Sequence, residues 1–181
     1  KACGRKVRVL SGEEEGRPHI TAFIVTKDMP GVSVGGHEDK MGIRASSTTT
    51  VHLDSVRVPN ANMLGPLHKG FKVAMHILNN GRRGLGGGSI GGMKKLIGLS
   101  TSYANERHTF GKPIRDYGLI KLKVAQMVID CYVTEALVDI VAMLIDQGYE
   151  EYAVEAAISK VYASEALWSA ADEALQIAGG N

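Results

Sequence analysis

Residues 70–110 read GFKVAMHILNNGRRGLGGGSIGGMKKLIGLSTSYANERHTF, and this stretch decides the fold. The apolar residues that recur at helical spacing near its start are Phe71, Ala74, Met75 and Leu78. Such a stripe is typical of an amphipathic helix with one face on a core. We therefore predict one long helix, which begins around Lys69 and ends around Arg107.

Three polar side chains, Asn79, Asn80 and Arg82, interrupt the apolar pattern of this helix. They bring hydrogen-bonding groups and a permanent positive charge to a face that would otherwise be apolar. Burying such groups is costly unless a ligand or a water-filled cleft faces them. The interruption predicts a binding site at this part of the helix.

The middle of the predicted helix is rich in glycine. The residues are Gly84, Gly86, Gly87, Gly88, Gly91 and Gly92. Each costs about 1 kcal/mol of helix propensity relative to alanine, so tertiary packing has to offset them. Close approach of a neighbouring helix or subunit is one interpretation, and it predicts that Gly88→Leu overpacks a contact; local fraying is another. A dinucleotide-binding loop is disfavoured because no strand precedes the glycines.

Towards the N-terminus, the first 58 residues have the β-branched, alternating pattern of strands. A hairpin is expected from a strand that ends at Leu10 and a strand over residues 19–26. A polar connection at residues 11–16, which includes three solvated glutamates, would join them. Further strands are expected at residues 32–34 and, as a pair, within residues 48–58.

The hydrophobic period changes from two to that of a helix near residue 62. We predict a domain boundary there, between a β part, residues 1–62, and a helical part, residues 63–181.

The helical part is expected to hold two further helices. One covers residues 119–147 and is ended by Gly148, and the other begins near Glu150 and ends at Gly179 and Gly180. The predicted fold class is α+β, with part of an antiparallel β domain followed by an incomplete antiparallel helical bundle.

Composition excludes several classes of function. The chain has 21 basic and 19 acidic residues, so its net charge gives no reason to expect nucleic-acid binding. Its two cysteines, Cys3 and Cys131, fit a reducing compartment better than a disulfide scaffold. No apolar run approaches the roughly 20 residues of a spanning helix, although peripheral membrane association stays open. The six histidines have no metal-ligand spacing, so no metal site is expected.

A short segment at the end of the first helix could bind an anion. Arg107 is followed by Thr109 and Gly111, which offer a guanidinium, a hydroxyl and close backbone approach to a phosphate. An arginine that caps the helix dipole is an equally good interpretation. The glycines after Gln176 are read as an ordinary end of the last helix.

Five motifs occur in a fixed order along the chain: MGIRASST at 41–48, VPNANMLG at 58–65, FKVAMHILNNGR at 71–82, RHTFG at 107–111 and QIAGGN at 176–181. Together they resemble the acyl-CoA dehydrogenase family over nearly the whole chain. The resemblance is strongest to the very-long-chain branch, which includes a sibling that assists assembly of respiratory complex I.

The resemblance implies a flavin site and a substrate cleft. Substrate contacts would fall on Asn79, Asn80, Gly81 and Arg82. FAD contacts would fall on Arg107, His108, Thr109, Tyr117, Gln176, Ile177, Ala178, Gly179 and Gly180. In this family FAD lies between protomers, so a homodimer or homotetramer is implied. Arg83 and Lys121 depart from the branch, which usually has an aromatic residue and a glutamine there.

The reaction that the resemblance implies is α,β-dehydrogenation of long-chain acyl-CoA thioesters in fatty-acid β-oxidation. Electrons would pass to electron-transferring flavoprotein, in mitochondria if the source is eukaryotic and in the cytoplasm if it is bacterial. No catalytic base is expected in this chain, because one family position matches Gly81 and the other would follow Asn181. The alternative is an assembly or binding protein of the same fold, with little or no turnover.

Overall fold

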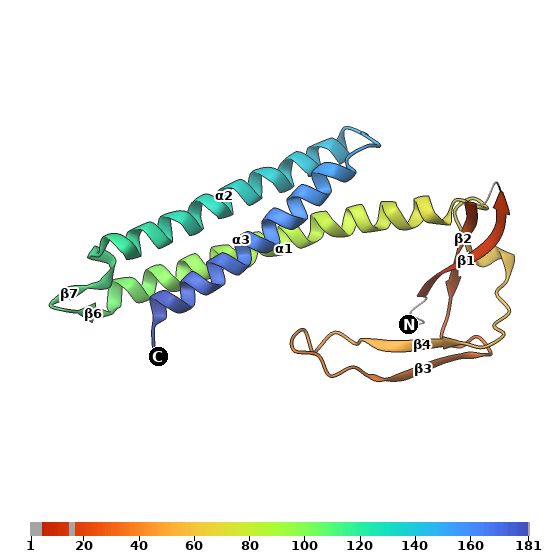
Figure 1. Ribbon diagram of the computed structural model, residues 1–181, viewed down its shortest axis with the longest axis horizontal. Helices are drawn as coiled ribbons and strands as arrows, with labels where there is room; N and C mark the ends of the chain where they lie inside the picture. The colour runs from red at the N-terminus through yellow and green to blue at the C-terminus, as the bar shows by residue number, and fades with distance from the viewer. Residues whose placement is uncertain (1–4, 15–16, 181) are drawn as a thin grey trace. The chain divides into compact units, whose positions relative to one another are not determined.

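The computed structural model describes residues 5–14 and 17–180, which form two compact units. The first unit holds the larger β-sheets and the second holds the helices (Figure 1). The units meet inside the long helix α1 (Gly70–Glu106), between His76 and Ile77. The change of hydrophobic period near residue 62 therefore comes before the point at which the compact units divide.

The first unit contains a three-stranded antiparallel sheet in the order β1-β2-β5. Its strands are β1 (Arg5–Glu14), β2 (Arg17–Val25) and β5 (Met63–Leu64). The predicted hairpin of the first two strands is confirmed. The prediction of a polar loop from Ser11 was wrong as far as Glu14, because a register shift between Leu10 and Gly12 lets β1 keep pairing with β2. Residues 15 and 16 of that loop lie outside the described residues.

The second antiparallel sheet is the pair β3 (Val32–His37) and β4 (Thr49–Leu53). Only one strand forms within residues 48–58, where a pair was expected. The strand ends before Ser55, whose φ of 49° breaks the extended conformation. A short 3-10 helix, η1 (Asn60–Asn62), then leads to β5.

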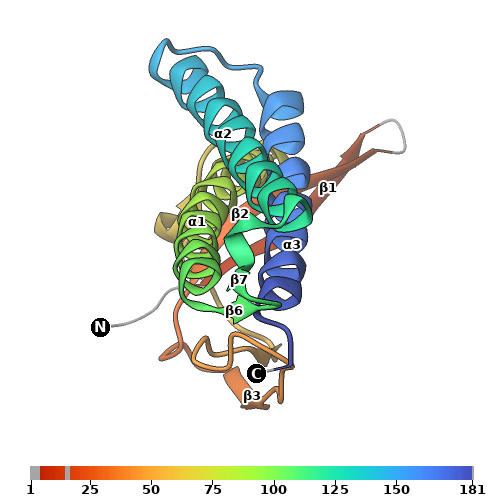
Figure 2. The ribbon, with the colours of Figure 1, turned by 90° about the vertical axis from the view of Figure 1, so that its left-hand side faces the viewer.

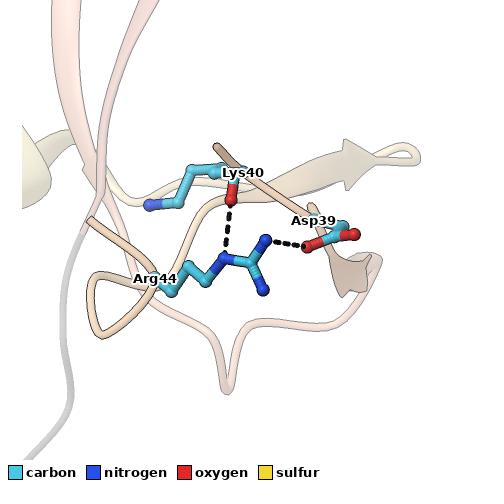
Figure 3. A network of polar contacts seen from close by, with 3 residues as sticks. All are labelled: Asp39, Lys40 and Arg44. Carbon is cyan, nitrogen blue, oxygen red and sulfur yellow. Dashed lines mark hydrogen bonds and ion pairs between the residues drawn. The ribbon is translucent and has the colours of Figure 1, made fainter. Parts of the chain in front are cut away.

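Arg44 organises the loop that joins β3 to β4 (Figure 3). Its Nε donates a hydrogen bond of 2.9 Å to the Lys40 carbonyl, and its Nη2 lies 3.5 Å from Asp39 Oδ1. The Lys40 ammonium in turn donates to the Ser46 carbonyl at 2.6 Å. Asp39, Arg44 and Ser46 are exposed and Lys40 is only half-buried, so the contacts shape the loop more than they stabilise the fold.

The start of α1 is tied to the first unit by close contact with β2. The backbone N–H of His68 donates to the buried Thr21 hydroxyl at 3.0 Å. A Cβ placed on Gly70 would lie only 2.6 Å from the backbone nitrogen of Ala22. These contacts explain why the first unit extends into the helix instead of ending where the periodicity changes.

The long helices of the second unit are residues 77–106 of α1, α2 (Gly118–Asp146) and α3 (Ala153–Ala178). These bounds confirm the three predicted helices to within three residues, and Gly148, with φ of 78°, ends α2 as expected. The central buried cluster is made of Met93, Ala104, Ile114, Met127, Cys131, Ala166, Ala170 and Ile177. Burial raises the pKa of the Cys131 thiol, which is consistent with an inert core cysteine. None of the described helices is long and apolar enough to cross a membrane.

The apolar stripe predicted at the start of α1 is only partly buried. Ala74 and Met75 are half-buried, but Phe71 and Leu78 are exposed. The expected core contact was therefore wrong for those two residues. The reason is that α3 begins opposite Asn80, so these turns of α1 precede the three-helix core.

The glycines of α1 divide into two groups. A Cβ on Gly86 would lie 2.6 Å from Val138 Cγ2 and 3.1 Å from the Ser159 hydroxyl, and one on Gly92 would lie 3.0 Å from Leu167. At Gly84, Gly87, Gly88 and Gly91, a Cβ would meet nothing within 4 Å. Close helix approach is therefore confirmed at Gly86 and Gly92. Within this chain it was wrong for Gly88, which lies on the open side of α1.

Candidate functional site

A tight hairpin follows α1 and carries the predicted anion-binding residues. Its strands are β6 (His108–Thr109) and β7 (Lys112–Pro113). The two turn residues, Phe110 and Gly111, have φ of 51° and 82°. Positive φ at both positions is typical of a type I′ turn, which matches the twist of a two-residue hairpin. The short helix η2 (Ile114–Asp116) then leads into α2.

The hairpin fixes the backbone of Arg107 and leaves its side chain free. The Arg107 N–H donates to the Tyr103 carbonyl at 2.9 Å, and the Arg107 carbonyl accepts from Ile114 N–H at 2.8 Å. The guanidinium is exposed and makes no hydrogen bond or ion pair with any residue that the structure describes. Nearby Arg115 differs, since it donates to Asn105 Oδ1 at 3.0 Å and lies 3.8 Å from Asp116. The charge on Arg107 is thus available to an anion.

Tyr117 supports this hairpin. Its hydroxyl donates to the Thr109 carbonyl at 2.9 Å, and Lys112 Nζ lies 4.3 Å from the centre of its ring. His108 is exposed, and its Nδ1 lies 3.0 Å from the Glu106 carbonyl. Thr109 is half-buried, and the Tyr117 hydrogen bond fixes its backbone carbonyl.

Phe110 was not among the predicted site residues, and it is the most unusual residue of the hairpin. Its side chain is 97% exposed, and its positive φ is unfavourable for an aromatic residue. The sequence signal that could have found it is an aromatic residue directly before glycine in a two-residue turn. Strain of this kind collects at functional sites, which marks Phe110 as a further candidate.

The end of α3 lies at the same end of the helical unit as the hairpin (Figures 1 and 2). The connectivity requires this, because α2 leads away from the hairpin and α3 returns. Gln176, Gly179 and Gly180 are exposed there, and Ala178 is half-buried. Ile177 instead is 4% exposed and packs in the core, so only its backbone could reach a ligand. The structure thus brings the predicted FAD contacts together at one end.

The predicted substrate contacts lie at the opposite end. Arg82 Nη1 donates to Asn79 Oδ1 at 3.1 Å, and the Tyr152 hydroxyl donates to Asn80 Oδ1 at 3.3 Å. Gly81 is exposed, with open space where a side chain would be. Arg82 is half-buried, yet within residues 5–14 and 17–180 it forms no ion pair. A cation and two carboxamides therefore gather on one stretch of α1.

The length of α1 separates these two groups. The 24 residues from Arg82 to Glu106 rise about 1.5 Å each and span about 36 Å. The substrate group and the hairpin group are therefore too far apart to contact one small ligand together in one chain.

Two other features of the described chain bear on the site. An apolar groove of about 450 Å³ runs between α1 and α3, and no predicted site residue lines it. Its lining residues are Leu85, Ser89, Lys160, Ser164, Leu167, Trp168 and Ala171. No group of three or more metal-ligating side chains comes together in the residues that the structure covers.

Comparison with known proteins assigns the chain to a family. The family model described as "Acyl-CoA dehydrogenase, C-terminal domain" matches residues 68–181. The human protein named very long-chain specific acyl-CoA dehydrogenase, mitochondrial, is 48% identical over 161 residues, which cover 89% of this chain and 25% of that protein.

Solved structures agree with this assignment. Butyryl-CoA dehydrogenase from Megasphaera elsdenii has a TM-score of 0.90 and 36% identity, over 97% of this chain and 45% of its own. An acyl-CoA dehydrogenase from Bacillus anthracis, solved in complex with FAD, has a TM-score of 0.80 and 39% identity, over 90% of this chain and 31% of its own. The chain spans about a quarter of the length of its mammalian relatives. With its helical unit matched by the family model and its fold shared with these enzymes, the chain belongs to the acyl-CoA dehydrogenase family.

Proposed function

We propose that the chain forms part of an FAD-dependent acyl-CoA dehydrogenase that introduces an α,β double bond into long-chain acyl-CoA thioesters. Electron-transferring flavoprotein would receive the electrons. The observation that carries the proposal is the arrangement of two polar groups along α1. One is the Arg107 guanidinium at the hairpin end, which no described residue pairs with, and the other is the donor-rich stretch at the opposite end of α1. The mammalian relatives are named mitochondrial proteins, which supports a mitochondrial location for a eukaryotic source and leaves a cytoplasmic one for a bacterial source.

The residues at the hairpin end fit a dinucleotide. The Arg107 guanidinium offers paired donors to a diphosphate, and Thr109 offers a hydroxyl. Phe110 exposes an aromatic face to a ring, and the backbone at Gly179 and Gly180 is open to close approach. When bound, FAD supplies the hydride acceptor that the dehydrogenation requires.

The distance along α1 supports an oligomer. About 36 Å separates the substrate stretch from the hairpin, but the ribityl chain of FAD is short and keeps the flavin ring near the diphosphate. One FAD cannot reach both groups of the same chain. We therefore propose that the hairpin end of one protomer holds FAD whose ring serves the substrate stretch of another, in a homodimer or homotetramer.

The substrate stretch lacks a proton acceptor of its own. Gly81 has no side chain, and Arg82 makes no ion pair with the described carboxylates. The 181-residue chain, loaded with FAD and mixed anaerobically with octanoyl-CoA or palmitoyl-CoA, is therefore expected to leave the flavin oxidised. Bleaching of the flavin absorbance by this chain would show that a described carboxylate acts as the base.

Arg82 is expected to act on the reaction more than on the cofactor. In the complete enzyme, Arg82→Gln should slow anaerobic flavin reduction about tenfold or more, because a hydrogen bond to a charged group is worth roughly 1.5–3 kcal/mol. FAD content should change less than the reduction rate, because the hairpin that is expected to hold the diphosphate lies far from Arg82 in the same chain. The neighbouring Arg83→Gln is the matched control for lost positive charge. Equal slowing by both variants would mean that general charge matters and the position of Arg82 does not.

A further inference from the structure

The two adjacent asparagines of the substrate stretch are held in the same way. Asn79 Oδ1 accepts from the Arg82 guanidinium at 3.1 Å, and Asn80 Oδ1 accepts from the Tyr152 hydroxyl at 3.3 Å. Each side-chain oxygen is therefore occupied by a donor from the protein. The Tyr152 contact is the longer-range one, since it joins residues 72 positions apart in the sequence.

A carboxamide has one oxygen that accepts and one NH₂ group that donates. When the oxygen is fixed by a protein donor, the orientation of the NH₂ group is fixed as well. Within the described residues, neither Asn79 nor Asn80 uses its NH₂ group in a hydrogen bond, and Asn80 is exposed. The stretch therefore presents N–H donors to a ligand that carries acceptor oxygens.

Tyr152 is well placed to hold Asn80 still. It directly precedes α3 and is 4% exposed, in a small core cluster with Val141 and Ala156. A buried phenol hydroxyl needs a hydrogen-bond partner, and Asn80 Oδ1 is that partner. An exposed asparagine would otherwise sample several rotamers, which costs binding free energy when a ligand orders it.

We infer that Tyr152 is a positioning residue, which fixes the Asn80 carboxamide so that its NH₂ group donates to an oxygen of the acyl-CoA ligand. The identity of the ligand rests on the proposed function, whereas the fixed amide rests on the structure alone. The acceptor is either the thioester carbonyl or a carbonyl or phosphate oxygen of CoA itself, and free CoA distinguishes these sources. Tyr152 touches no reacting atom in this account and acts only through Asn80.

The first test is made without any ligand. Tyr152→Phe keeps the ring in its cluster and removes only the hydroxyl. The side-chain NH₂ resonances of Asn80 are assigned by their loss in Asn80→Asp. In Tyr152→Phe, the chemical shifts of these resonances should move towards the values of an asparagine side chain that rotates freely. The matched control is Tyr162→Phe, which removes a tyrosine hydroxyl on α3 that donates to Asp130 Oδ1 at 3.1 Å. Unchanged Asn80 resonances in Tyr152→Phe would overturn the inference, whatever the ligand.

The second test measures octanoyl-CoA affinity by calorimetry in a double-mutant cycle. Tyr152→Phe should weaken binding about threefold to tenfold, as expected for loss of one neutral hydrogen bond. In the Asn80→Ala background the same change should have no effect, because the residue acts through Asn80. A weakening that persists in that background would overturn the inference. If Tyr152→Phe weakens the binding of free CoA as well, the acceptor oxygen belongs to CoA. If it weakens only the binding of octanoyl-CoA, the acceptor is the thioester carbonyl.

The two tests separate failure of the inference from failure of the proposed function. If the unmodified chain binds neither octanoyl-CoA nor CoA, the proposed ligand is wrong, and the resonances of Asn80 alone decide whether Tyr152 fixes the amide. A melting temperature that falls in Tyr152→Phe, with Asn80 resonances and affinity both unchanged, would show that Tyr152 only stabilises the fold.

Discussion

Replacing Arg107 by alanine is expected to weaken FAD binding by tenfold or more. The guanidinium is exposed and unpaired among the described residues, and the hairpin fixes its backbone. A charge-assisted contact to a diphosphate is worth roughly 1.5–3 kcal/mol, and removing the side chain breaks no ion pair with a described residue. The measurement is a titration of FAD with the chain, followed by flavin fluorescence.

Arg115→Ala is the control for this experiment. Arg115 lies at the same end of the helical unit, but its guanidinium is already engaged by Asn105 and Asp116. Its loss should change FAD affinity by less than about threefold, since exposed ion pairs contribute little. If both variants weakened FAD binding equally, Arg107 would contribute only general positive charge at this end of the unit. Unchanged affinity in Arg107→Ala would leave it as a residue that only ends α1.

Replacing Gly86 by leucine is expected to lower the free energy of unfolding by about 3 kcal/mol. A Cβ at this position would already lie 2.6 Å from Val138 Cγ2 on α2 and 3.1 Å from the Ser159 hydroxyl on α3. The stiff valine side chain cannot move aside easily, so the helices must separate. Overpacking of this kind costs about 1–3 kcal/mol, occasionally more. Thermal and urea unfolding followed by circular dichroism measure the change.

Gly88→Leu provides the matched control, with the same substitution on the open side of the helix. A Cβ there meets nothing within 4 Å in this chain. Leucine forms helix better than glycine, so stability should rise by about 0.5–1 kcal/mol. If Gly88→Leu destabilises the chain as much as Gly86→Leu does, the face of α1 that carries Gly88 is packed as well, and the distinction between the two glycines is wrong.

The sequence predicted the helices well because their signals are local. The apolar period and the glycine after α2 set the limits of α1, α2 and α3 to within a few residues. The sequence alone did not predict which glycines of α1 face a neighbouring helix. Gly86 and Gly88 are two residues apart and look alike in the sequence, but a helix turns them to different sides, so only the packing of α2 and α3 tells them apart.

Some features of the candidate site also could not be predicted from the sequence. The pairing of Tyr152 with Asn80 joins distant positions, and no local pattern marks it. Phe110 belongs to the RHTFG motif, but its positive φ and its full exposure come from the fold of the hairpin. The extension of β1 to Glu14 was missed because a run of glutamates favours solvent, while register and backbone pairing favour the strand. All three features depend on tertiary contacts, and the secondary-structure propensities of single residues carry no information about such contacts.

The central claim is that FAD binds at the hairpin end of the helical unit, far from the substrate stretch of the same chain. Amide chemical-shift mapping of the ¹⁵N-labelled chain during FAD titration tests it most directly. We expect the largest shifts at residues 107–113 and 176–180, and smaller shifts at residues 79–82, where the flavin ring of a partner protomer's FAD would lie. Shifts concentrated at residues 79–82, or spread evenly over α1, would contradict the account.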